Sequence, residues 1–293
     1  MGRPRHGRRR RVPVVAPSVL SLIRNPVETI AFIAALRSAF QRRSDVFVDL
    51  SAVTELTSDA VLVMISKFED QRFVNGMRVG GSEPLADRPR QMLHQAGFFQ
   101  TVRSVQFKEP PEHGRIRRKR NFIVEPEIAQ ELIEFATERM VGGAQDKPGV
   151  YLALLESMAN THEHAARETK AMESWWANVY APPGNKRSFF TFVDNGVGIF
   201  RSVTVRRIRR SIGMTDNVGL LKDWFAGKIT VPSRTGERTR GKGLRAIHRE
   251  FQRRRLTNLV IIANDVYANV AENRYELLPN PFHGTFLYWE LEA

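Results

Sequence analysis

Three polar residues recur at intervals of four along one predicted helix, and side chains of these types can together handle a phosphate group and a metal ion. Glu156, Asn160 and His164 lie within the predicted helix at 148–167. At 3.6 residues per turn this spacing places them on one stripe, each about one turn from the last. An amide oxygen is a hard ligand that suits Mg²⁺, and a carboxylate can orient a nucleophilic water or hydroxyl group. A solvated helix face can have the same pattern. The other motifs in the sequence therefore determine whether this stripe is a functional site.

A second group of chemically suited residues follows a predicted strand. The strand at 187–194 ends in Asp194, and Gly196 and Gly198 come after it at alternate positions. Glycines let a ligand approach the backbone closely. An aspartate at such a turn can accept a hydrogen bond from the exocyclic amine of adenine. The pattern indicates a loop that binds a nucleobase, although a plain β-turn has the same composition.

A third group is a basic, glycine-containing turn that precedes a predicted helix at 243–255. Its residues are Arg240, Gly241, Lys242, Gly243 and Leu244. The backbone N–H groups and the dipole of a helix that begins here suit a polyphosphate, and the two basic side chains add positive charge. The lysine is followed by glycine, so this is not the Walker pattern, in which Ser or Thr comes next.

In this order the three groups resemble the motifs of the GHKL ATPase superfamily, which includes type II topoisomerase ATPase domains, heat-shock chaperones, histidine kinases and mismatch-repair ATPases. The resemblance covers about residues 125–293. The positions that match its N box, first glycine box and second glycine box are, in turn, Glu156, Asn160 and His164; Asp194, Gly196 and Gly198; and Gly241, Gly243 and Leu244. Thr239 departs from the pattern, because it replaces the first glycine of the second box. Thr285, after Gly284, resembles the threonine that supports adenine in several members.

The resemblance implies ATP and Mg²⁺ as cofactors and a role for each matching position. Asn160 would coordinate Mg²⁺ through its side chain. Glu156 would act as the general base, on water in the ATPases or on a serine hydroxyl in the anti-sigma serine kinases. Asp194 would bind adenine. His164 would either touch the phosphates or support its helix.

The same resemblance implies a phosphate site under a lid. The lid would be the basic stretch at 200–240, in which only Arg238 and Arg240 are expected to contact phosphate. The residues expected to line the phosphate site are Arg240, Gly241, Lys242, Gly243 and Leu244. A GHKL domain would be an α/β sandwich, the Bergerat fold, over residues 122–293.

Periodicity in the C-terminal segment agrees with such a sandwich. The predicted helices cover 125–140, 148–167 and 243–255, and the predicted strands cover 173–180, 187–194, 258–264 and 284–291. Gly142 and Gly143 are expected to stop the first helix. The order of these elements predicts a mixed sheet with helices on one face.

The N-terminal segment, residues 14–105, alternates predicted strands and helices, which predicts a mostly parallel sheet covered by helices. Strands are expected at 14–22, 46–50 and 77–81, and helices from Pro26 to about Phe40, at 58–73 and at 84–100. Asn25 and Glu28 have the spacing of a capping box at the first helix. Residues 1–13 are expected to be a basic tail, and 106–121 a linker.

This N-terminal segment resembles the STAS domain (sulfate transporter and anti-sigma antagonist). The resembling stretches are Val46 to Leu50, Leu56 to Ala60 and Val79 to Gly81. In that family a serine before the helix is phosphorylated by a partner kinase, and Asp59 occupies the corresponding position here. Two interpretations remain open: the carboxylate imitates part of the phosphate charge, or it caps the first turn of a helix.

Composition restricts the kinds of site that these segments can contain and the compartment in which they are expected. The chain contains no cysteine and has a formal charge of +14, so disulfides and thiolate metal sites are excluded and a reducing, cytoplasmic location is expected. No apolar run reaches the eighteen or so residues of a membrane span. The basic clusters at 2–11, 115–120, 206–210 and 253–255 either bind a polyanion such as nucleic acid or are solvated surface.

Three functions are consistent with these observations. The first is a Mg-ATP-binding regulatory protein, an ATPase or serine-kinase-like switch of the anti-sigma type with a fused STAS-like domain, whose partner would be a regulator or a sigma-like factor. The second is an ATP-gated homodimeric clamp that acts on nucleic acid. The third is an inactive ATP-binding scaffold, which the presence of Glu156 and Asn160 disfavours.

Overall fold

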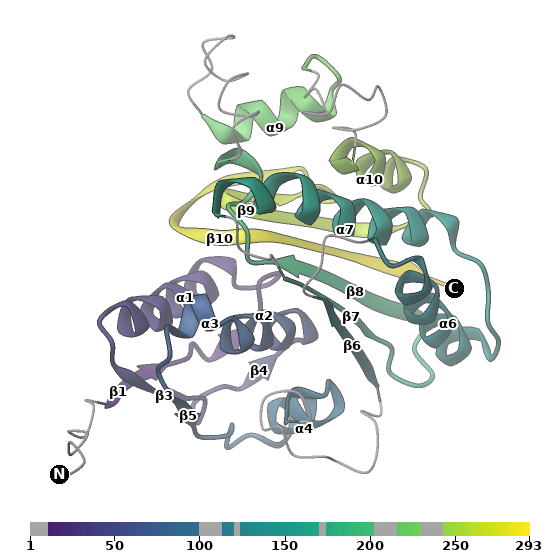
Figure 1. Cartoon of the computed structure of the whole chain (residues 1–293). Helices are drawn as coiled ribbons and strands as arrows, with labels where there is room; N and C mark the ends of the chain where they lie inside the picture. Colours follow the sequence, from purple (N-terminus) through teal and green to yellow (C-terminus); the bar gives the residue numbers. More distant parts are fainter. Residues whose placement is uncertain (1–10, 100–112, 120–123, 170–173, 202–215, 230–242) are drawn as a thin grey trace, which may run out of the picture.

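The computed structural model of the chain describes residues 11–99, 113–119, 124–169, 174–201, 216–229 and 243–293. Helices and strands are combined in an α/β structure, as predicted (Figure 1). The described strands form a three-stranded, a two-stranded and a five-stranded sheet. Residues 1–10, and most of the predicted lid at 200–240, lie outside the described residues.

The N-terminal segment contains parallel strands and covering helices, but two predictions are wrong: the strand expected at 14–22 is two short strands in different sheets, and the first of them begins at Arg11, inside the expected tail. Strands β1 (Arg11–Val15), β3 (Asp45–Asp49) and β5 (Val79–Gly81) pair in parallel in that order, and β2 (Val19–Leu20) pairs in parallel with β4 (Glu55–Leu56). The helices are α1 (Pro26–Gln41), α2 (Ser58–Glu69), α3 (Gln71–Val74) and α4 (Asp87–Gln95). Pro13 is tolerated in β1 because this strand is at the edge of its sheet.

The first helix begins at Pro26 as expected, but the predicted capping box is wrong. The side chain of Asn25 accepts no hydrogen bond from the helix. Its Nδ2 atom instead donates to the Val19 carbonyl at 2.9 Å and to Oε2 of Glu28 at 2.8 Å. The asparagine therefore ties the helix start to β2 rather than satisfying helical N–H groups.

The C-terminal segment forms one five-stranded sheet with strand order β6-β7-β8-β10-β9, in which every neighbouring pair is antiparallel. Its strands are β6 (Gly114–Lys119), β7 (Trp175–Tyr180), β8 (Arg187–Asp194), β9 (Thr257–Asn269) and β10 (Arg274–Glu292). Its helices are α6 (Pro126–Val141), α7 (Pro148–Thr169), the 3-10 turn η1 (Ile199–Arg201), α9 (Asn217–Phe225) and α10 (Gly243–Gln252).

Three expectations about this sheet are corrected. The sheet is antiparallel rather than mixed. Residues 114–119, expected in a linker, form its edge strand β6. The strands predicted at 258–264 and 284–291 are parts of one long hairpin, β9 and β10.

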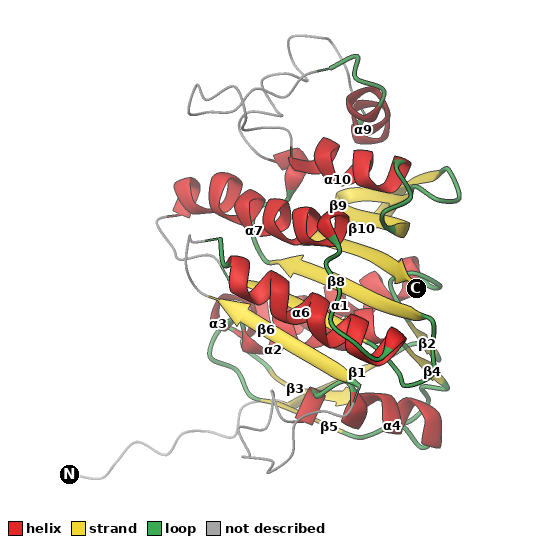
Figure 2. Cartoon of the chain, turned by 90° about the vertical axis from the view of Figure 1, so that its right-hand side faces the viewer, coloured by secondary structure: helices red, strands yellow, loops and turns green. Residues whose placement is uncertain are grey.

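Both faces of the five-stranded sheet are covered. Helices α6, α7 and α10 pack on one face, and α1 and α2 of the N-terminal segment pack on the other (Figures 1 and 2). Successive residues of a strand point to opposite faces, and in β10 Leu287 and Trp289 belong to the core under α7, whereas Phe286 and Tyr288 belong to the core shared with α1 and α2. The prediction of helices on one face only is therefore incomplete.

Candidate functional site

The end of β8 meets the middle of β10 at the floor of a pocket beside α7. The sheet register sets Asp194 directly opposite Thr285. A small cavity of about 30 Å³ lies here, between these strands, α7 and α9. It is lined by Ser157, Asn160, Thr161, Phe192, Asp194, Val197, Gly198, Ile199, Trp224, Leu244, Thr285 and Leu287. Five predicted residues, from four separate stretches of the sequence, therefore share one cavity: Asn160, Asp194, Gly198, Leu244 and Thr285.

The start of α10 joins the polar stripe of α7 to this pocket. A Cβ atom built on Gly243 would lie 2.8 Å from Oδ1 of Asn160 and 2.9 Å from Oε2 of Glu156. Residues four apart on one helix share a face, and α10 begins against that face. Only glycine leaves room at this position for both side chains. The geometry places the predicted metal ligand, the predicted base and the beginning of α10 within contact of one another.

The loop after β8 is organised by its own aspartate and by a residue that the sequence analysis missed. Oδ1 of Asp194 accepts a hydrogen bond of 2.8 Å from the Gly196 N–H. Asn264, buried in β9, accepts from the Phe200 N–H at 2.9 Å and donates to the Val197 carbonyl at 2.8 Å. The asparagine thus closes the loop on both sides of Gly198. Its signal in the sequence is an amide that ends the apolar run of the predicted strand at 258–264.

Two glycines of the site are required by their backbone conformation and by close contacts. Gly198 has a φ of +79°, and an added Cβ would meet the Asn264 side chain at 2.7 Å. Gly284 has a φ of +98°, and an added Cβ would lie 1.8 Å from the Asp194 carbonyl oxygen. Side chains at both positions would combine strain with collision. The backbone at Asp194 is therefore held between two glycine-dependent turns.

Other pocket residues come from positions that the motifs do not include. Trp224 of α9 is 5% exposed and lines the pocket opposite the sheet. Ser157 and Thr161 are also buried, but their hydroxyl groups donate to carbonyls one turn back in α7, at 2.6 Å and 3.2 Å. The apolar lining from Phe192, Leu287 and their neighbours would suit a flat ring held between the sheet and α9.

Several predicted site residues are not tested by these contacts. Arg240, Gly241 and Lys242 lie outside the described residues, as does the side chain of His164, although its backbone belongs to α7. Within the described part of the chain, no group of three or more His, Asp or Glu residues could hold a metal ion. A Mg²⁺ ion can take most of its ligands from phosphate and water, so it needs no such group. A single protein amide oxygen, that of Asn160, is enough for such a site.

A second cleft, of about 650 Å³, lies between the N-terminal segment and the sheet, and Asp59 forms part of its wall. Asp59 is 2% exposed, and its Oδ2 atom accepts a 2.7 Å hydrogen bond from the Leu22 N–H. Burial raises the pKa of this carboxyl group. The side chain therefore links the start of α2 to the loop before α1. It is not an exposed carboxylate that could imitate a phosphate.

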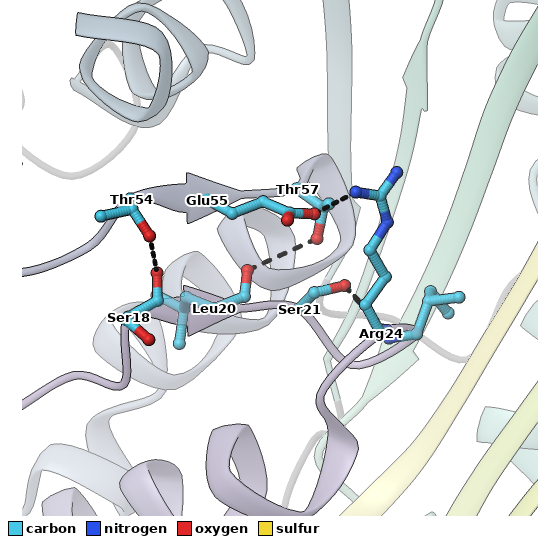
Figure 3. Close-up of polar contacts among 8 residues, drawn as sticks. Ser18, Leu20, Ser21, Arg24, Thr54, Glu55 and Thr57 are labelled. Carbon is cyan, nitrogen blue, oxygen red and sulfur yellow. Dashed lines mark hydrogen bonds and ion pairs between the residues drawn. The ribbon is translucent and has the colours of Figure 1, made fainter. Parts of the chain in front are cut away.

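The strands beside Asp59 form a closely bonded corner, shown in Figure 3. Oγ1 of Thr54 donates to the Ser18 carbonyl at 3.2 Å, and Arg24 pairs with Glu55. The Arg24 N–H donates to Oγ of Ser21 at 3.2 Å. These contacts fix β2 and β4 relative to each other at the mouth of the second cleft.

Two of the basic clusters form ion pairs with acidic side chains of the same chain, although their basic side chains remain 37–60% exposed. On β6, Arg117 pairs with Glu131, Arg118 with Glu69 and Lys119 with Glu125. After α10, Arg253 and Arg255 each contact Glu250 at 3.0 Å. These pairs compensate part of the charge of the clusters, which weakens the case for a polyanion path along them; Arg253 and Arg255 share one carboxylate. The clusters at 2–10 and 206–210 lie outside the described residues.

Comparisons with known proteins add no assignment to this geometry. No protein-family model matches the chain, and a search of curated proteins finds no significant match. Among the described helices, none is both long and apolar enough to cross a membrane.

Proposed function

We propose that the C-terminal segment is a GHKL-type domain that binds Mg-ATP in the pocket between α7, the β8 loop and α10. Adenine would lie over Phe192 and Leu287, with its exocyclic amine donating to Asp194 and with Thr285 beside it. Asn160 would supply an amide oxygen to Mg²⁺. Glu156, one turn earlier on the same face of α7, would orient the nucleophile.

The single observation that carries this proposal is the contact of Gly243 with both Asn160 and Glu156. A helix N-terminus is a favourable place for phosphate, because its N–H groups and dipole attract negative charge. Here that N-terminus lies against an amide and a carboxylate, the groups suited to a metal ion and a general base. Asp194 lines the same pocket and would supply the base-binding group.

We further propose that the chain is a regulatory protein, an ATPase or serine-kinase-like switch that acts with a protein partner. The support is the N-terminal segment, whose sequence resembles a STAS domain and whose helices α1 and α2 share a core with the ATP-binding sheet. A partner that binds the N-terminal segment would thereby act on the nucleotide site. The buried Asp59 fits a segment that is not itself a phosphate acceptor at this position.

The alternative of a nucleic-acid clamp receives less support, because the clusters on β6 and after α10 are paired with acidic side chains. Binding of DNA or RNA that falls steeply with salt would favour it. An inactive scaffold would instead bind ATP without turnover, and Glu156→Gln would then change nothing.

The experiment that tests nucleobase recognition compares ATP with GTP in wild-type protein and in Asp194→Asn. Wild type should prefer ATP, and the variant should bind ATP at least about tenfold more weakly, since it replaces an acceptor by a donor toward the adenine amine. Asp45→Asn is the matched control, because Asp45 also accepts a backbone N–H, from Arg78 at 3.0 Å, in the N-terminal segment. Equal ATP affinity in all three proteins would remove Asp194 from the site.

A further inference from the structure

A lysine of the N-terminal segment lies buried against the loop that follows β8. Lys67, near the end of α2, is 1% exposed. Its Nζ atom donates to Oδ1 of Asn195 and, at 2.9 Å, to the His283 carbonyl. The same ammonium group lies 4.7 Å from the centre of the Phe282 ring. The charge is therefore held by an amide oxygen, a carbonyl oxygen and an aromatic face.

A buried ammonium group is costly unless its charge is compensated, so a lysine at this depth requires these partners. Both hydrogen-bond acceptors flank the proposed adenine-binding residue. Asn195 directly follows Asp194, and His283 precedes Gly284, whose α-carbon packs on the Asp194 carbonyl. Lys67 thus bridges the two backbone segments on either side of Asp194.

The contact between α2 and the loop is reciprocal. Nδ2 of Asn195 donates a 3.0 Å hydrogen bond to the Ser66 carbonyl of the same helix. Asn195 therefore uses its oxygen for Lys67 and its nitrogen for Ser66, and both bonds lead to one turn of α2. Because Asp194 and Asn195 are adjacent in the chain, movement of this turn moves the proposed adenine site.

We propose that Lys67 is a positioning residue for the nucleotide site, through which the N-terminal segment sets the affinity of the C-terminal segment for ATP. This proposal rests on the proposed function, because its ligand is ATP. The contact of Lys67 with the loop after β8 does not depend on that function. By linkage, ATP binding strengthens the contact between α2 and the loop by the same factor that the contact strengthens ATP binding. A partner that displaces α2 lowers ATP affinity.

The test compares Lys67→Met with Glu69→Ala. Glu69 is on the same helix and bonds across the same interface, to Trp176 Nε1 at 2.7 Å and to Arg118, and neither of these partners lines the pocket. Lys67→Met should weaken ATP binding about tenfold, and Glu69→Ala should leave it unchanged although it also removes interface contacts. Asn195→Ala should weaken binding similarly, and the double variant Lys67→Met, Asn195→Ala should lose little more than either single variant.

Amide hydrogen exchange without nucleotide provides a readout that is independent of ATP. In Lys67→Met the amides of residues 195–200 and 283–285 should exchange faster than in wild type and in Glu69→Ala, while the helix α6 is unchanged. If wild type fails to bind ATP but this exchange pattern appears, the proposed function is wrong and the positioning role stands. Unchanged exchange in these two segments, or equal loss of ATP affinity in Lys67→Met and Glu69→Ala, would overturn the positioning role.

Discussion

Gly243 at the start of α10 packs against the side chain of Asn160 on α7 so closely that an added methyl carbon would lie 2.8 Å from Oδ1. Glu156 lies equally close to the same point, at 2.9 Å. Three residues that are up to 87 positions apart in the chain (243 minus 156) thus meet at one corner. This corner is where the proposed metal ligand, base and phosphate site coincide.

We therefore predict that Gly243→Ala weakens Mg-ATP binding at least about tenfold, because the methyl group displaces Asn160 and Glu156 from their positions. The displaced atoms are the ends of flexible side chains, so the free energy of unfolding should change by less than about 1 kcal/mol. Calorimetry and urea denaturation measure the two quantities. Gly143→Ala, where nothing lies within 4 Å of the new carbon, is the control. Equal ATP affinity in both variants would show that this corner does not take part.

A substitution at Gly284 tests the close packing of this residue against the Asp194 carbonyl. Gly284→Ala should lower the free energy of unfolding by at least about 3 kcal/mol, because a positive φ is combined with a collision with backbone, which cannot swing away. Gly142→Ala, with a φ of +75° at the end of α6 but open space around it, should cost only about 1–2 kcal/mol. Chemical denaturation of the pair separates collision from strain. Similar losses in the two variants would mean that strain alone acts at Gly284.

Trp224 offers an optical signal for the pocket. Because it lines the cavity on α9, ATP should change the tryptophan emission of the wild-type protein, and Trp224→Phe should abolish that change. Trp289→Phe should retain it, since Trp289 is fully buried in the core under α7 and stacks on Phe190. An ATP-dependent change that survives in Trp224→Phe would place the nucleotide away from α9.

Asp59 gives a prediction about pH. Burial raises the pKa of this group in the folded protein, whereas an unfolded aspartate titrates near pH 4. The stabilisation from protonated Asp59 is thus fully present below about pH 4 and is lost as the pH rises through the raised value. Asp59→Asn has no such loss, so its stability relative to wild type should increase with pH over that interval. Urea denaturation from pH 4 to 8 measures this difference, and a difference that is independent of pH would contradict the assignment.

Local signals predicted the elements that carry the site. The apolar spacing and the glycine stop at Gly142 predicted α6 and α7 within one or two residues of their observed bounds. Spacing singled out Asn160, Asp194 and Gly198, and the resemblance to the GHKL superfamily added Thr285; the fold brings all four to one pocket. Such features depend on contacts within a few residues, which a sequence displays directly.

Features that depend on distant partners were missed. Strand β6 carries four basic residues and so has the composition of a linker, but Arg117 and Arg118 are neutralised by Glu131 and Glu69 from two different helices. Lys67 has the position of an ordinary basic residue in the last turn of α2. Its burial follows only from the packing of that helix on strands β7 and β8, which its local sequence does not indicate.

The measurement that tests the central claim most directly is calorimetric titration of the wild-type protein and of Asn160→Ala with ATP, each with and without Mg²⁺. We predict micromolar, Mg²⁺-dependent binding to wild type, and loss of this Mg-dependent binding in Asn160→Ala while its circular dichroism and melting temperature are unchanged. Absence of binding to folded wild-type protein at millimolar ATP, or an affinity that neither Mg²⁺ nor the Asn160→Ala substitution alters, would contradict it.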